Sequence, residues 1–139
     1  MQRFKTSNSM NFECSVESLW DIVSSANYLN NVHPFCSDNS IIHWDNDKHE
    51  DKIVYLNGLT FVRKFVSWKE FEGYDLWIGI NNRNQSFVEW RLEKVNSGSK
   101  LTITVYPFLY SDWPKVFSFL PYFLFVNIKL KSYLFSVLS

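Results

Sequence analysis

The chain has 139 residues, the size of one ordinary domain, so a second domain is not expected. Lysine plus arginine and aspartate plus glutamate number 14 each, which excludes the positive field that a dedicated nucleic-acid binder or a protein held on an anionic membrane needs. The 13 Phe, 7 Tyr and 6 Trp residues are an unusually large aromatic share, and they predict an apolar space walled by rings.

Targeting and redox signals are weak in this sequence. Residues 1–10 contain no apolar stretch of the kind that a signal peptide requires, so we expect a cytoplasmic protein. Cys14 and Cys36 match neither a zinc-binding spacing nor CxxC, and we expect structural thiols. The most apolar window, 116–128, is shorter than the roughly 20 residues that a bilayer span needs, so no transmembrane segment is expected.

The first part of the chain predicts one strand followed by two short helices. Residues 3–13 alternate as a strand, and Ser15 offers a hydroxyl N-cap to a helix whose apolar residues recur at helical spacing over 16–23. A second short helix or turn over 26–32 is expected to end before Pro34, because the residue that precedes a proline is disfavoured in the helical conformation.

From residue 40 the apolar pattern changes to the alternation of strands. Turn signals at Asn57-Gly58, Gly73, 81–85 and 96–98 divide this part into a meander of hairpins. One face of the resulting sheet is expected to be core. The predicted strands are 40–44, 51–56, 59–70, 74–80, 86–95 and 101–108.

The last segment returns to helical spacing. Residues 121–138 predict a helix with Pro121 at its first position and with Leu130 and Leu134 on one apolar side. The predicted fold class is therefore α+β. This order of elements is that of a helix-grip fold, in which a curved antiparallel sheet of about six to seven strands wraps around a long C-terminal helix, with two short helices after strand one and a cavity between sheet and helix.

Several segments also resemble a known group of proteins. The chain resembles the SRPBCC superfamily, the START-like group that includes polyketide cyclases/dehydrases, plant pathogenesis-related ligand binders and lipid-transfer domains. The resemblance covers the whole chain and implies a single helix-grip domain for a hydrophobic small molecule. The segments that carry it are FECSVESLWDIV, YLNNVHPFC, NGLTFVRKFVSW, SFVEWRLEKVNSGSKLTITVYP and LKSYLFSVL.

Two neighbouring cations interrupt an otherwise apolar predicted strand. A buried cation must be paired or must hold an anion, so Arg63 or Lys64 is a candidate for binding a carboxylate or enolate oxygen of the ligand. The alternatives are a bulge that lets both cations reach solvent, or an ion pair with Glu89 or Glu93. A two-residue type I′ turn would place Asp51 opposite Lys64. Which cation faces inward is left open, because one residue more or less in the Gly73 turn exchanges the faces.

The candidate ligand-binding residues combine these cations with rings and with the last helix. His33 is a possible proton donor, although a capping or exposed histidine explains it equally well. His43 and His49 are expected at the surface. The histidines fall on different predicted elements and no motif for a cofactor or a metal occurs, so neither is expected. The expected binding set is Tyr55, Arg63, Lys64, Trp68, Trp90, Tyr106, Leu130 and Leu134.

Three functions remain open from the sequence. The leading hypothesis is binding, or transport, of a lipid or polyketide-like compound. The second is a cyclase/dehydrase-like enzyme that uses the same pocket. The third is a protein-interaction or dimerisation module, which would use aromatics on the convex face such as Phe61, Phe65 and Trp77.

Overall fold

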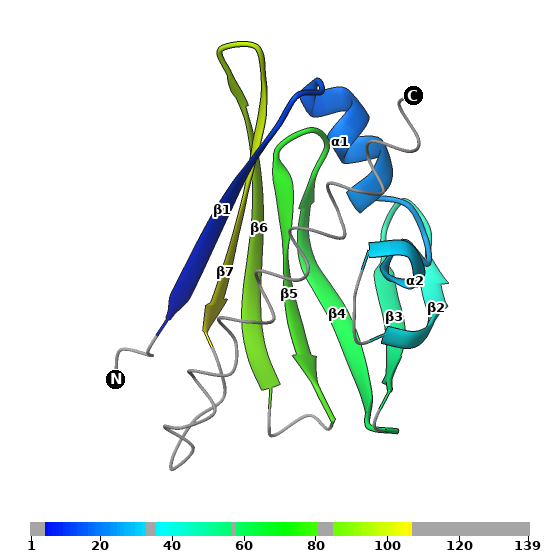
Figure 1. Cartoon of the computed structure of the whole chain (residues 1–139). Coiled ribbons are helices and arrows are strands. Elements are labelled where there is room, and N and C mark those ends of the chain that lie inside the picture. Colours follow the sequence, from blue (N-terminus) through cyan, green and yellow to red (C-terminus); the bar gives the residue numbers. More distant parts are fainter. Residues whose placement is uncertain (1–4, 33–35, 57, 81–84, 107–139) are drawn as a thin grey trace.

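The computed structural model describes residues 5–32, 36–56, 58–80 and 85–106. Within these residues, seven strands form one antiparallel sheet and two short helices follow the first strand, which confirms the predicted α+β class (Figure 1). The predicted helix over 121–138 lies outside the described residues. The elements are β1 (Thr6–Phe12), α1 (Val16–Val23), α2 (Leu29–Val32), β2 (Cys36–Trp44), β3 (His49–Tyr55), β4 (Thr60–Lys69), β5 (Gly73–Gly79), β6 (Gln85–Val95) and β7 (Gly98–Tyr106).

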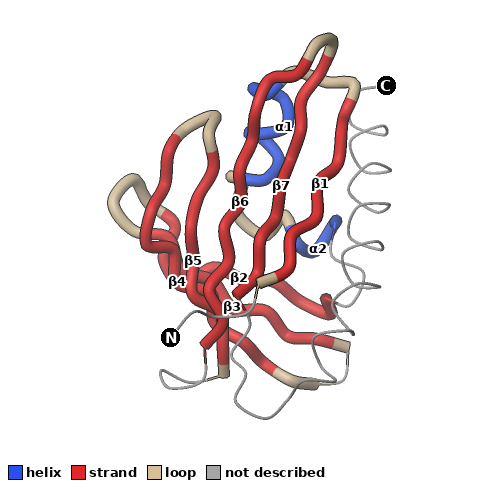
Figure 2. Tube along the Cα trace, turned by 90° about the vertical axis from the view of Figure 1, so that its left-hand side faces the viewer, coloured by secondary structure: helices blue, strands red, loops and turns tan. Residues whose placement is uncertain are grey.

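The sheet is a meander that the first strand completes. The strand order is β1-β7-β6-β5-β4-β3-β2, so β1 pairs with the last strand and both β1 and β2 are edges. Both helices lie on the same side of the sheet: α1 contacts β6 and β7, and α2 contacts β2 (Figure 2). We call this side the inner face and the opposite side the outer face.

Strand alternation places the apolar residues on the inner face. In β7 the buried residues Leu101, Ile103 and Val105 alternate with half-buried ones, and Trp90 and Leu92 of β6 lie beside them. Burying one such side chain contributes about 1.5–3 kcal/mol, so this layer is the main source of stability. The predicted alternation is therefore confirmed in the second half of the sheet.

Helix α1 begins as the sequence predicts. The Ser15 hydroxyl oxygen accepts a hydrogen bond of 3.1 Å from the backbone N–H of Ser18, which satisfies one of the free donors of the first turn. Leu19, Trp20 and Val23 are buried against the sheet. The N-cap therefore fixes where the helix starts, and the apolar stripe fixes which side faces the core.

The β3–β4 turn differs from the prediction by one residue. The backbone N–H of Tyr55 donates to the carbonyl of Leu59 at 2.8 Å, so three residues, 56–58, separate this pair instead of two. Gly58 supplies the positive φ of 90° that a longer hairpin turn of this kind needs. The predicted two-residue turn is wrong, and every pair along the hairpin is shifted: Asp51 lies opposite Arg63, and Lys64 lies opposite Glu50.

Candidate functional site

A buried ion pair lies on the inner face where β3 and β4 run side by side. Asp51 and Arg63 are 0% and 3% exposed, and the register places them directly opposite each other. The Arg63 Nε donates to Asp51 Oδ1 at 2.8 Å and its Nη2 donates to Oδ2 at 2.6 Å. This two-bond geometry is the strongest form of the arginine–carboxylate interaction. The expected partners Glu89 and Glu93 are therefore wrong, because they lie two strands away.

The guanidinium continues into a chain of tyrosine hydroxyls. Arg63 Nη1 donates to the Tyr28 hydroxyl at 3.1 Å, and the Tyr28 and Tyr74 hydroxyls are 2.7 Å apart. Tyr74 donates its proton to the carbonyl of Val23 at 2.8 Å, so the proton between the two hydroxyls belongs to Tyr28. The chain therefore runs from β4 through the residue before α2 and through β5 to the end of α1.

The carboxylate is anchored from the opposite side by Asn39 of β2. The Asn39 Nδ2 donates to Asp51 Oδ2 and to the carbonyl of Lys52, each at 3.1 Å. Its Oδ1 accepts from the backbone N–H of Leu29, at the start of α2, at 3.3 Å. This network positions α2 against β2 and β3, and it satisfies the buried polar groups that would otherwise be costly.

Burial and charge fix the protonation states of this network. Burial raises the pKa of Tyr28 and of Tyr74, so both hydroxyls remain protonated at neutral pH. Desolvation would lower the pKa of Arg63, but the nearby Tyr28 and Asp51 outweigh it and raise that pKa above its usual value. The network therefore holds one guanidinium cation, one carboxylate and two neutral phenols.

Aromatic rings fill the inner face beside this network. Trp68 stacks on Tyr74 with ring centroids 5.0 Å apart, and it stacks on His49 at 3.6 Å. Tyr74 also contacts Trp90 at 5.5 Å, so Trp68 and Trp90 lie on either side of one tyrosine. The expected surface position of His49 is wrong, because its ring is half-buried against Trp68. At this end of the sheet the rings pack on one another and on α1.

The other end of the inner face is less covered. It lies toward the β3–β4 turn and the start of β6, which Figure 1 shows at the same end of the sheet. Tyr55, Phe61 and Ile78 are half-buried here, and the rings of Tyr55 and Phe61 meet edge to face at 5.1 Å. Val88 and Val105 complete this surface, with 8% and 6% exposure. We call these five residues the lower inner face.

Two of the expected site residues lie on the outer face. Lys64 pairs with Trp77 of β5, and Tyr106 contacts Phe87, with ring centroids 5.9 Å apart. Alternation separates both from Arg63 and Trp90 by the thickness of the sheet. The expected outer position of Trp77 is confirmed. Phe61 and Phe65 were expected on the outer face, which is wrong, because they share the inner parity of Arg63.

The structure thus gathers only part of the expected set. Tyr55, Arg63, Trp68 and Trp90 share the inner face, whereas Leu130, Leu134 and His33 lie outside the described residues. Sequence reasoning missed Tyr28, Asn39, Asp51 and Tyr74. Asp51 could have been found from the correct hairpin register, but no local sequence signal marks the others.

The outer face has its own ion pairs. Arg91 Nη2 lies 2.6 Å from Asp75 Oδ1 and 3.0 Å from Glu89 Oε2, and the Arg91 side chain is 47% exposed. The expected surface pairing of Arg91 is confirmed for Glu89. Such exposed pairs contribute about 0–1 kcal/mol each.

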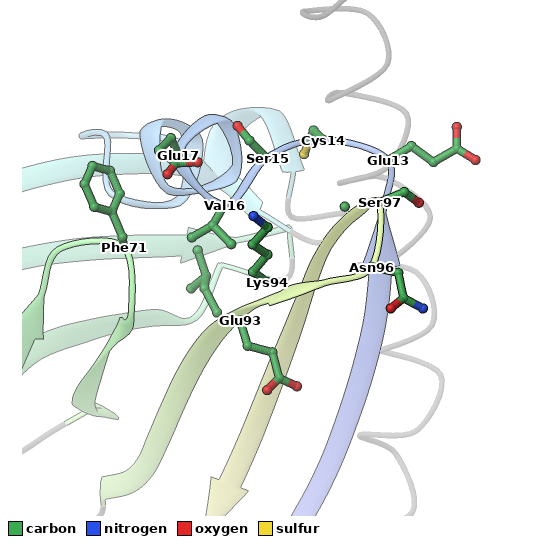
Figure 3. A pocket seen from close by; sticks show the side chains of 12 residues that line it. Glu13, Cys14, Ser15, Val16, Glu17, Phe71, Glu93, Lys94, Asn96 and Ser97 are labelled. Atoms are coloured by element: carbon green, nitrogen blue, oxygen red, sulfur yellow. The ribbon is translucent and has the colours of Figure 1, made fainter.

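A hollow lies at the far end of the sheet, between the β6–β7 hairpin and the start of α1. Its volume is about 560 Å³, and Cys14, Val16, Phe71 and Lys94 are among its lining residues. Figure 3 shows the Lys94 side chain directed toward the turn that opens α1. Exposed polar side chains line much of the hollow, and the packed rings separate it from the lower inner face.

Metal and membrane features were sought in the same residues. In the described part of the chain, no group of three or more His, Cys, Asp or Glu side chains is arranged to hold a metal ion. Among those residues, no helix has the length and apolar character required to cross a bilayer.

Comparison with known proteins places the fold. No protein-family model matches the sequence, and no curated protein matches it. Solved structures do match: XoxI from Bacillus cereus has a TM-score of 0.76 at 16% identity, over 97% of this chain and 98% of that one. Ara h 8.0201 has a TM-score of 0.74 at 15% identity, over 97% and 99%.

A third match comes from a biosynthetic locus. DynU16, a protein of the dynemicin biosynthetic locus, has a TM-score of 0.77 at 11% identity, over 94% of this chain and 46% of that one. At these identities the likeness concerns the fold alone. The structural neighbours are helix-grip folds, and the described sheet and helices of this chain are arranged in the same way.

Proposed function

We propose that this protein binds a hydrophobic small molecule between the lower inner face of the sheet and the segment 107–139. The observation that carries the proposal is the uneven cover of the inner face. Tyr74, Leu76 and Leu101 are fully buried under α1 and the packed rings, whereas Tyr55 and Phe61 at the other end are half-buried apolar surface. Apolar side chains converging with a few polar groups are typical of a ligand site.

The proposal extends to the segment that would close the site. In a helix-grip fold the last helix lies across the inner face, and residues 121–138 have the helical spacing for this role. Leu130 and Leu134 on its apolar side would then face Phe61 and Tyr55 across the ligand. The likeness to Ara h 8.0201 over nearly the full length of both chains supports this arrangement.

The test is binding of a neutral fluorescent probe, N-phenyl-1-naphthylamine, combined with native mass spectrometry of the purified protein. We expect saturable fluorescence enhancement and a retained apolar compound that is lost on denaturation. Phe61→Ala should lower probe affinity by about tenfold, because it removes a ring from the wall of the site. Phe71→Ala is the matched control, since Phe71 is an exposed ring at the opposite end of the sheet. Absence of saturable binding by the parent protein would refute the proposal.

A cyclase/dehydrase-like enzyme is the second candidate, and Tyr55 is the residue that favours it. Burial raises the pKa of Tyr55 to about 12, so its hydroxyl stays protonated at neutral pH and can donate a hydrogen bond to a carbonyl or enolate oxygen. Tyr55→Phe keeps the ring and removes that donor. An enzyme would bind substrate with nearly unchanged affinity in this variant and lose turnover, whereas a carrier would show no turnover in either protein.

A further inference from the structure

The cation of the inner face is already fully engaged within the protein. Both oxygens of Asp51 accept from the Arg63 guanidinium, at 2.8 and 2.6 Å, and a third Arg63 donor is held by Tyr28 at 3.1 Å. Two opposite charges at this distance act on a more distant group as a dipole, so their combined field falls off steeply. The Arg63 guanidinium also lies 4.9 Å from the centroid of the Phe65 ring, which covers another of its sides.

The remaining titratable groups of the inner face add no charge near neutral pH. Burial raises the pKa values of Tyr28, Tyr55 and Tyr74, which keeps all three phenols neutral. Burial lowers the pKa of His49, which favours its uncharged imidazole. The charged side chains of the neighbouring strands point to the outer face by alternation: Glu50, Lys52, Lys64, Asp75, Glu89 and Arg91.

We infer that the ligand of the proposed site is uncharged, an apolar molecule whose polar groups are of the alcohol, ketone or ester class. An anion entering this site would lose its hydration without gaining a counter-charge from the described residues, and that desolvation is very costly. A neutral oxygen can share a hydrogen bond with a phenol at little cost. This inference rests on the proposed function and narrows it.

The experiment compares two competitors that differ only in charge. The protein is loaded with N-phenyl-1-naphthylamine and titrated with dodecanol or with dodecanoate, below their aggregation limits and at a pH well above the pKa of a carboxylic acid. We expect dodecanol to displace the probe at a concentration at least about tenfold lower than dodecanoate does. Displacement by dodecanoate at an equal or lower concentration would overturn the inference while leaving the proposed function standing. Failure of the probe itself to bind would instead remove the proposed function.

Asp51→Asn tests whether the ion pair sets this preference. The substitution removes the carboxylate and leaves the Arg63 charge uncompensated, so the preference for dodecanol should shrink or reverse by about tenfold. Asp75→Asn is the matched control: it removes the same charge from the outer face, where Asp75 pairs with Arg91, and should leave the ratio unchanged. An unchanged ratio in folded Asp51→Asn would contradict the role of the pair.

A double variant keeps the test decisive if Asp51→Asn does not fold. Asp51→Asn combined with Arg63→Gln removes both charges together and keeps hydrogen-bonding groups at both positions. Because the inferred ligand does not use the Arg63 charge, the ratio of the two competitors should equal that of the parent protein. Selective loss of dodecanoate binding would show that Arg63 serves as an anion receptor, and would overturn the inference.

Discussion

A guanidinium that is 3% exposed is tolerated in a protein interior only when its charge and its donors are satisfied. Arg63 meets this condition through Asp51 and Tyr28, and Asp51 meets it through Arg63 and Asn39. Buried pairs of this kind are often no more stabilising than apolar residues of the same size, but breaking one is costly because the other charge is left alone. The network therefore acts mainly to specify how α2, β3 and β4 are placed.

Arg63→Met is expected to lower the free energy of unfolding by about 3–5 kcal/mol, because it leaves the Asp51 carboxylate buried without its cation. Arg91→Met is the control on the outer face, where the exposed pair contributes at most about 1 kcal/mol. Urea denaturation monitored by tryptophan fluorescence measures both. Equal effects in the two variants would show that the buried pair has no special role.

The buried tyrosines predict a loss of stability in alkali. The pKa of Tyr55 rises from 10.0 to about 12 in the folded protein, so the folded state holds this proton more tightly than the unfolded chain does. The stabilisation is therefore complete below pH 10.0 and is lost as the pH rises toward 12. Unfolding free energies across this range should fall less steeply in Tyr55→Phe than in the parent. Identical slopes would exclude the shift.

At the scale of elements, the sequence was sufficient for strand positions but not for the register of one hairpin. Alternation in Leu101, Ile103 and Val105 and the Ser15 N-cap are local signals, and the structure confirms both. The β3–β4 turn depends on how many residues lie between the last paired positions, and Asn57-Gly58 suits turns of either length. A one-residue error there assigned Asp51 to Lys64 and concealed the ion pair of the site. The contacts of Tyr28 and Asn39 depend on α2 packing, which no local pattern encodes.

The β4–β5 connection depends on Gly73 more than on any other turn residue described here. Its φ is 137°, and a Cβ at this position would overlap the carbonyl oxygen of Trp90 in β6. Gly73→Ala should therefore destabilise the protein by more than Gly58→Ala. At Gly58 a Cβ would meet open space, and the cost is about 1–2 kcal/mol of backbone strain alone. Thermal unfolding of the two variants measures the difference, and a larger effect at Gly58 would contradict the geometry.

At the scale of the whole molecule, the inner face divides into two functional parts. The part under α1 is filled by rings in mutual contact, such as Trp20, Trp68 and Tyr74, and this part supports the fold. The part near Tyr55 and Phe61 has rings that are only half-buried. The aromatic excess of the sequence thus contributes both to the core and to the proposed site, and composition alone cannot apportion it.

The proposed closure of this site by the last helix can be tested along one segment. Leu134→Glu should lower affinity for N-phenyl-1-naphthylamine by at least about tenfold, because it places a carboxylate on the apolar side of the expected helix. Ser136→Glu introduces the same group on the opposite side and should have little effect. Fluorescence titration measures both affinities, and circular dichroism verifies that both variants fold. Equal losses would argue against a helix gripping the ligand.

The pairing of β1 with β7 also has a consequence for how the chain folds. Ser7 and Thr104 are 97 positions apart in sequence, and their hydroxyl oxygens lie 2.8 Å apart in the sheet. During synthesis β1 leaves the ribosome first and has no strand to pair with until β7 has emerged. Long-range pairing of this kind slows folding, because the entropy of closing a long loop is lost before any contact compensates for it. The first strand made is thus among the last to be secured, and until then its hydrogen-bonding edge is open to other chains.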